Sequence, residues 1–135
     1  MPLVAVKVKP GPQFIVYFVE ENGHCPMEEF LTNLVGSDAG RMLRYIDNTA
    51  SVGLIRNPEQ SGCLDNGMHY WRTARGDGAR AFYFTQPGKI VVCTHGYVKK
   101  KDKISQQEIA RAEIWRQKYL KAVLDKTLII VERLI

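Results

Sequence analysis

The sequence predicts a single α+β domain over residues 1–135: a strand, two antiparallel helices, a three-stranded antiparallel meander and a C-terminal helix. Three observations lead to this prediction. Apolar residues repeat at helical spacing in three segments, aromatic and β-branched runs of strand length occupy four others, and turn residues separate these segments. The length of 135 residues suits one domain, and 45% hydrophobic residues supply a core, which excludes wholesale disorder.

Two strand signals begin the chain. Residues 4–9 alternate apolar and other side chains before a Pro-Gly-Pro break, so we expect residues 1–10 to form an additional edge strand or a loose arm. Residues 14–19 are a continuous aromatic and β-branched run, which predicts a strand that ends at the following Glu-Asn-Gly turn.

Two helices are expected next. Residues 26–34 begin with a proline, which suits a first helical turn, and two glutamates then favour the positive helix start. A Gly-Ser-Asp break leads to a second helix over residues 38–52, whose expected inner face contains Met42, Leu43, Ile46 and Ala50. Because the break is short, the two helices are expected to be antiparallel.

The middle of the chain predicts the meander. Residues 67–75 and 79–85 are rich in aromatic side chains, and an Asp-Gly turn signal separates them. A Gln-Pro-Gly turn then leads to a third strand over residues 89–98.

The C-terminal part contains one clear helix and one ambiguous segment. Residues 105–108 have the Ser-x-x-Glu spacing of a capping box, so a helix should begin there, with Trp115 and Tyr119 in the core. Residues 126–135 form an apolar extension that could prolong the helix or pair as a strand. We expect it to be buried against the domain's own sheet, and docking of a partner or a homodimer is the alternative.

Composition narrows the class of protein. No apolar run could span a membrane and the start does not fit a signal peptide, so we expect a soluble cytoplasmic protein. Three widely spaced cysteines without a paired motif indicate reduced thiols, with neither a metal site nor a cofactor. Nineteen basic against fourteen acidic residues give a net charge of +5. Because the positive charge is clustered, a polyanion is a candidate partner.

The clustered charge surrounds the expected meander. Arg72 precedes the Asp-Gly turn and Arg80 follows it, so adjacent strands could bring both onto one surface. The third strand ends in the sequence His-Gly-Tyr-Val-Lys-Lys over residues 95–100, which adds an imidazole, a phenol and ammonium groups. Guanidinium groups bind an RNA phosphate and its transition state, while Lys, Tyr or His can move protons at the 2′-hydroxyl and the leaving oxygen.

Each of these residues also has a structural interpretation. The two arginines could be solvated strand residues, His95 a hydrogen-bonded core histidine, and the lysine run a solvated surface. Spacing alone therefore indicates only a basic α+β domain that could bind RNA.

Two motifs resemble one known family. Residues 21–31, which read ENGHCPMEEFL, are similar to the "ENG-x-x-P-x-x-x-FL" opening of the phage-derived, HigB-like branch of the RelE/ParE toxin superfamily. Residues 95–100 resemble that branch's "HGF-x-KK" signature, with Tyr97 in place of Phe. The order of the expected elements is similar as well, and the resemblance covers residues 14–121.

The resemblance implies a compact RelE-like fold and a type II toxin that cleaves mRNA in the ribosomal A site without metal, by attack of the 2′-hydroxyl. Its partners would be the ribosome, mRNA and a cognate antitoxin, a small helix-turn-helix protein, with no membrane and with a homodimer or hetero-oligomer as assembly. The candidate catalytic residues are Arg72, Arg80, Lys99, Lys100, His95 and Tyr97, and the candidate RNA- or ribosome-binding residues are Arg75, Lys101, Lys103, Arg41 and Arg44.

Within this resemblance, Arg72 and Arg80 match the family's phosphate-binding arginines, and we expect Arg80 to be exposed. His69 and Tyr70 replace the usual Trp-Glu pair, and Ile104 stands where some relatives have a tyrosine, so the general base stays open. The alternatives are a ParE-like toxin that inhibits gyrase by binding, or a phage-derived RNA-binding regulator.

Overall fold

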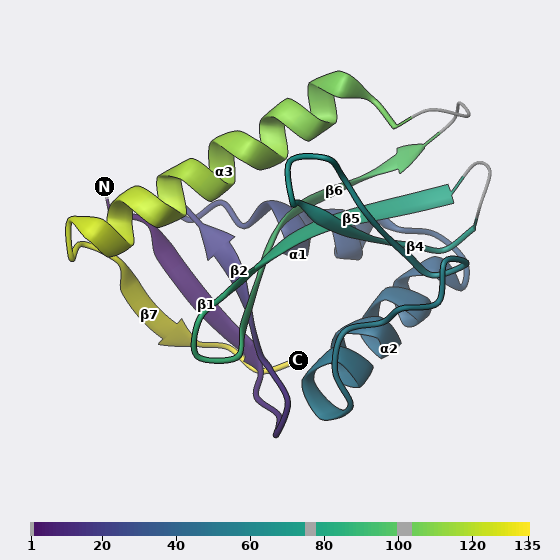
Figure 1. The fold of residues 1–135 in the computed structure, drawn as a ribbon, viewed down its shortest axis with the longest axis horizontal. Helices are drawn as coiled ribbons and strands as arrows, with labels where there is room; N and C mark the ends of the chain where they lie inside the picture. Colours follow the sequence, from purple (N-terminus) through teal and green to yellow (C-terminus); the bar gives the residue numbers. More distant parts are fainter. Residues whose placement is uncertain (1, 75–77, 100–103) are drawn as a thin grey trace.

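A seven-stranded mixed sheet with helices on both faces makes up the fold (Figure 1). The computed structural model describes residues 2–74, 78–99 and 104–135. In that part of the chain the strands are β1 (Val4–Lys9), β2 (Ile15–Glu20), β3 (Ser61–Cys63), β4 (His69–Arg72), β5 (Gly78–Gln86), β6 (Ile90–Lys99) and β7 (Ile129–Glu132). The helices are α1 (Pro26–Asn33), α2 (Asp38–Ser51) and α3 (Gln106–Leu124). The prediction of the α+β class is confirmed.

The strand order is β3-β4-β5-β6-β2-β1-β7. Strands β3 to β6 form an antiparallel meander, and β2 joins it by pairing in parallel with β6. Strand β1 pairs antiparallel with β2 and parallel with β7, so the two ends of the chain lie side by side in the sheet.

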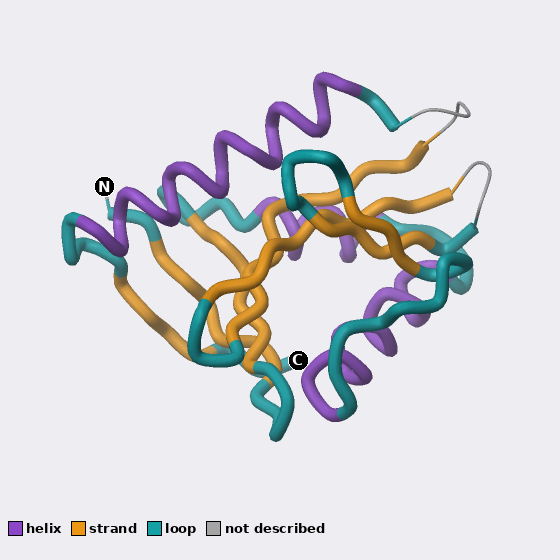
Figure 2. The backbone as a smooth tube through the Cα atoms, viewed as in Figure 1, coloured by secondary structure: helices purple, strands orange, loops and turns teal. Residues whose placement is uncertain are grey.

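The two faces of the sheet carry separate hydrophobic clusters, because successive strand side chains point to opposite faces. Helices α1 and α2 cover one face and contribute Met27, Met42 and Ile46 to its cluster. Helix α3 covers the other face (Figure 2). Trp115 and Tyr119 of this helix pack in the cluster on that face. Both aromatic residues are nearly fully buried, as the sequence predicted.

Three expectations about the strands need correction. Strand β1 is not at the edge, because β7 pairs with its free side. The meander has a fourth strand, β3, whose Ser-Gly-Cys sequence carries no alternation that would reveal it. The C-terminal extension pairs with the chain's own sheet through its backbone, yet all four side chains of β7 are exposed.

The helices follow their predicted bounds within about one residue. In α2 the expected inner face is correct except for Leu43, which is exposed, while Tyr45 and Thr49 are buried instead. Helices α1 and α2 pack mainly against the sheet rather than against each other. No helix in residues 2–74, 78–99 and 104–135 combines the length and apolarity needed to cross a membrane.

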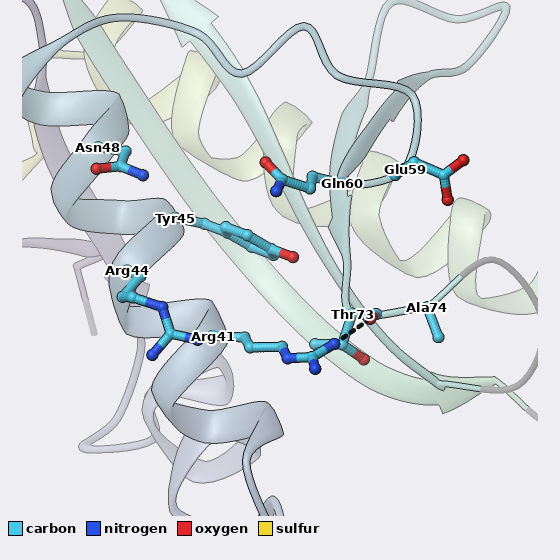
Figure 3. Close-up of a pocket in the computed structure, with 8 residues that line it drawn as sticks. All are labelled: Arg41, Arg44, Tyr45, Asn48, Glu59, Gln60, Thr73 and Ala74. Atoms are coloured by element: carbon cyan, nitrogen blue, oxygen red, sulfur yellow. Dashed lines mark hydrogen bonds between the residues drawn. The ribbon is translucent and has the colours of Figure 1, made fainter.

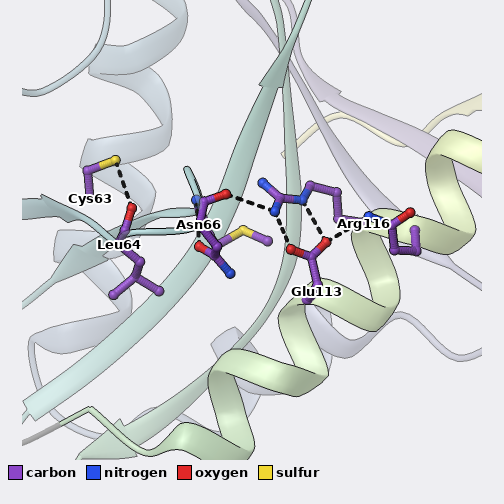
Figure 4. A network of polar contacts seen from close by, with 7 residues as sticks. Cys63, Leu64, Asn66, Glu113 and Arg116 are labelled. Atoms are coloured by element: carbon purple, nitrogen blue, oxygen red, sulfur yellow. Dashed lines mark hydrogen bonds and ion pairs between the residues drawn. The ribbon is translucent and has the colours of Figure 1, made fainter.

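Helix α3 is fixed over the sheet at two points. The Oγ atom of Ser105 accepts a hydrogen bond from the Glu108 amide at 3.4 Å, which caps the helix as the sequence predicted. Further along, Arg116 donates to the Asn66 carbonyl at 3.0 Å and pairs with Glu113, and this network ties α3 to the loop before β4 (Figure 4). These contacts fix the position of α3 relative to the meander.

Candidate functional site

Arg72, Arg80 and Tyr97 form a row across three neighbouring strands. The register pairs Arg72 of β4 with Arg80 of β5, and Arg80 with Tyr97 of β6. Residues directly opposite in adjacent strands point to the same face of a sheet. That face is the one under α3, because Tyr97 packs against the same cluster as Trp115 and Tyr119. We call these three residues the arginine row.

Arg80 lies at the centre of the arginine row and is buried, with only 1% of its surface exposed. The expectation that it is exposed was wrong, because Arg72 and Tyr97 lie on either side of it in the neighbouring strands. Burial lowers the pKa of Arg80, and the neighbouring charge of Arg72 lowers it further. Two guanidinium groups held side by side repel each other, and an anion that binds both would relieve this repulsion.

Two residues outside the arginine row, Pro58 and Tyr45, hold Arg72 by hydrogen bonds. Its guanidinium donates to the Pro58 carbonyl, and its own backbone carbonyl accepts a hydrogen bond from the Tyr45 hydroxyl at 3.1 Å. Within the described residues, the buried Nε of Arg72 has no hydrogen-bond partner. Tyr45 of α2 and the Pro58 carbonyl therefore hold Arg72 in place beside Arg80 of the neighbouring strand.

Tyr97 has its hydroxyl positioned by the start of α3. The Ser105 amide donates to the Tyr97 oxygen at 3.1 Å, and the phenol ring stacks on Phe82 with ring centres 6.0 Å apart. Because the oxygen accepts this bond, the phenol proton remains available for donation. Tyr97 therefore offers a proton donor at the end of the arginine row.

Lys99 continues the arginine row by one step. It pairs with Gly78 and lies two residues after Tyr97 on the same strand, so it points to the same face. Its side chain is only 4% exposed. Four other basic candidates lie outside the described residues: Arg75, Lys100, Lys101 and Lys103.

His95 lies in the core under α3 and not in the arginine row. Its Nε2 is 3.2 Å from Oε1 of Glu108, its ring centre is 5.2 Å from that of Phe82, and 1% of it is exposed. Burial lowers the pKa of His95 to about 4, and the charge of Arg111 acts in the same direction. At neutral pH this histidine is uncharged, which fits the interpretation as a hydrogen-bonded core residue.

The burial of His95 predicts an acid-sensitive fold. The unfolded chain protonates this histidine near pH 6.5, whereas the folded chain resists protonation down to about pH 4. The unfolded state thus binds more protons in this window, so the free energy of unfolding should fall by up to about 3 kcal/mol as the pH falls from 6.5 to 4. Burial lowers the pKa of His69 too, which adds to the same trend.

Urea unfolding at a series of pH values measures this effect. His95→Gln should flatten the curve between pH 4 and 6.5, because it removes the buried titrating imidazole. An equal slope in the wild-type protein and the His95 variant would contradict the assignment.

Arg41 and Arg44 lie on the opposite face of the sheet. They project from α2 into a cavity of about 350 Å³, and Arg41 donates to the Thr73 carbonyl at 2.9 Å (Figure 3). The other residues lining this cavity are Tyr45, Asn48, Glu59, Gln60 and Ala74. The structure therefore separates these two arginines from the arginine row.

The two motifs that carry the family resemblance contact each other. A Cβ atom at Gly96 would lie 2.4 Å from two ring atoms of Phe30 and 2.7 Å from the Arg80 carbonyl oxygen. Only glycine permits this approach, so the Phe30 ring of α1 packs against the backbone of β6, on the opposite face from the arginine row. The spacing of the motifs gave no sign of this contact.

Sequence reasoning did not assign the residues that support the site. Tyr45 holds the backbone of Arg72, and Glu108 holds His95. Their partners are distant in the sequence, so only the fold brings them together. Among the described residues, no group of three or more His, Cys, Asp or Glu side chains is placed to hold a metal ion.

One family model matches most of this chain. The family model of phage-derived Gp49-like proteins (DUF891) matches residues 29–117, well over half of the chain. The chain belongs to the Gp49-like family. The matched span contains the whole arginine row and Lys99, whereas strands β1 and β7 of this Gp49-like protein lie outside it. No curated protein matched the chain.

Proposed function

We propose that this Gp49-like protein is the toxin of a type II toxin–antitoxin system, similar to HigB, and that it cleaves mRNA on the ribosome. The observation that supports this proposal is the arginine row with Lys99 beside it: two adjoining guanidiniums, a phenol and an ammonium group on one face. A phosphodiester needs this combination, because its transition state carries extra negative charge and two protons must move. The toxin-like character of the family points the same way.

The reaction would be an internal transfer at phosphorus. The 2′-hydroxyl oxygen forms a bond to the adjacent phosphorus and loses its proton, while the bond from phosphorus to the 5′ oxygen breaks and that oxygen gains a proton. The products are a 2′,3′-cyclic phosphate and a 5′-hydroxyl. Arg72 and Arg80 would hold the non-bridging oxygens, and their charges replace those that a metal ion would supply.

Tyr97 and Lys99, at the end of the arginine row, would transfer the protons. Tyr97 is suited to protonate the leaving oxygen, because its own oxygen already accepts from Ser105 and its proton is available. Lys99 lies close enough in register to assist, and Lys100 remains a candidate of the same kind. A partner antitoxin would silence the toxin by covering this row with acidic side chains.

A reconstituted reaction tests the proposal. Purified protein is incubated with ribosomes that carry a defined mRNA, and the ends of the fragments are mapped. We expect cleavage only when ribosomes are present, 5′-hydroxyl ends, and no loss of activity in EDTA. A parallel preparation of Arg80→Met controls for contaminating ribonucleases.

The competing functions give different results in the same assays. A ParE-like toxin would leave the mRNA intact and inhibit supercoiling by gyrase. A regulator would bind RNA without cleavage and without arresting growth on expression. Either result would overturn the proposed endonuclease.

A further inference from the structure

Strand β7 ends the sheet with an exposed apolar surface. Five apolar side chains in and beyond this strand are at least one-third exposed, and Ile130 is 60% exposed. Two more lie at the end of α3, where Leu124 is 81% exposed. We call this set the β7 patch: Val123, Leu124, Ile129, Ile130, Val131, Leu134 and Ile135.

The open side of β7 also carries backbone groups that can pair. The amides of Ile129, Arg133 and Ile135 donate to carbonyls of residues 3–8, which shows that the odd-numbered residues face β1. The N–H and C=O groups of Ile130 and Glu132 therefore point away from β1, toward the side where the sheet ends. An apolar edge of this kind is a template for another strand.

The charges of this segment are already neutralised within the chain. Glu132 is 3.6 Å from Lys7, and Arg133 pairs with Glu20 at 2.8 Å and with Glu28 at 2.9 Å. An acidic partner would be attracted to the arginine row, which lies on strands at the other end of the sheet order. The charges beside the β7 patch are paired within the chain, so the patch would not attract an acidic partner. It is suited instead to another apolar surface, such as the same patch on a second copy.

We propose that the β7 patch binds a second copy of this chain, with two β7 strands paired antiparallel about a two-fold axis. An axis near Val131 places Ile130 opposite Glu132 of the partner and Val131 opposite its counterpart, so the two glutamates do not face each other. The outward backbone groups of Ile130 and Glu132 then bond across the interface, and one continuous sheet runs through both subunits.

The size of the patch supports a dimer. Seven side chains with these exposed fractions present several hundred Å² of apolar surface, divided between the two faces of the sheet beside one edge strand. Together with the backbone edge this approaches the roughly 800 Å² per partner of a standard interface. The proposal is independent of the proposed ribonuclease activity, because it needs neither RNA nor the arginine row.

Sedimentation of the full chain tests the proposal without RNA or ribosomes. From about 1 to 100 μM, the wild-type protein should change from the 15.4 kDa monomer to twice that mass. Val131→Lys should weaken the dimer at least tenfold, because the two lysines would face each other directly across the axis. Ile130→Pro should do the same, since it removes an outward N–H and no bond to β1. Val35→Lys, at a valine that is 83% exposed, is the matched control and should not change the mass.

Hydrogen exchange gives a second measurement that needs no mutation. The amides of Ile130 and Glu132 should exchange more slowly at high protein concentration than at low concentration, while the amides that already bond to β1 should not change. A wild-type chain that stays monomeric at 100 μM would overturn the proposal and leave the patch to another protein. A dimer that survives Ile130→Pro would overturn the strand pairing, provided that circular dichroism shows both variants folded.

Discussion

Arg80→Met should slow mRNA cleavage by about a hundredfold or more at saturating ribosomes, which corresponds to about 3 kcal/mol of transition-state stabilisation. Methionine fills most of the space of the buried arginine stem but carries no charge for the phosphate. The measurement is the single-turnover rate of cleavage on ribosomes. Because Arg80 is buried, its replacement also changes the fold's stability, so urea unfolding must accompany the rate.

Two further variants make this result specific to the guanidinium. Arg80→Lys keeps the charge but loses the planar pair of donors, so it should recover only part of the rate. Arg56→Met removes an exposed arginine outside the arginine row and should cleave like the wild type. Full activity in a folded Arg80→Met protein would remove this residue from the site.

Deleting residues 128–135 should unfold the protein or reduce its free energy of unfolding by about 3 kcal/mol or more. The deletion removes the amides of Ile129, Arg133 and Ile135 that bond to the first strand, at roughly 1 kcal/mol each. It also leaves Glu20 and Glu28 without the Arg133 guanidinium. Circular dichroism and urea unfolding of the shortened chain measure the loss.

The shortened chain also separates the roles that this segment can have. A folded and toxic product that escapes its antitoxin would identify the segment as an antitoxin-docking element. A folded product that is neutralised as usual would show that the segment matters neither for the fold nor for the antitoxin.

The features of the fold that were predicted correctly from the sequence are those that depend on residues close together in the chain. An Asp-Gly turn between two aromatic runs determines that β4 and β5 pair, and this pairing places Arg72 opposite Arg80. The capping residues fixed the start of α3, and helical spacing fixed most of the α2 inner face. These elements were predictable because each depends on residues within a few positions of one another.

The rest depends on contacts between distant segments. Tyr97 comes opposite Arg80 only because the register between β5 and β6 shifts between Ala81 and Tyr83. The burial of Arg80 depends on the two strands on either side of it, and the pairing of His95 with Glu108 depends on where α3 crosses the sheet. Strand β3 has too few residues and no alternation, so it exists only because β4 offers it an edge.

The pairing of β1 with β7 also affects when the protein can finish folding. Residues 4–7 pair with residues 129–132, so the first strand must wait for nearly the whole chain to be made. At the usual rate of about 5–20 residues per second, that wait lasts roughly 10 s. The complete sheet therefore forms late in synthesis, and chains that terminate before residue 129 never acquire it.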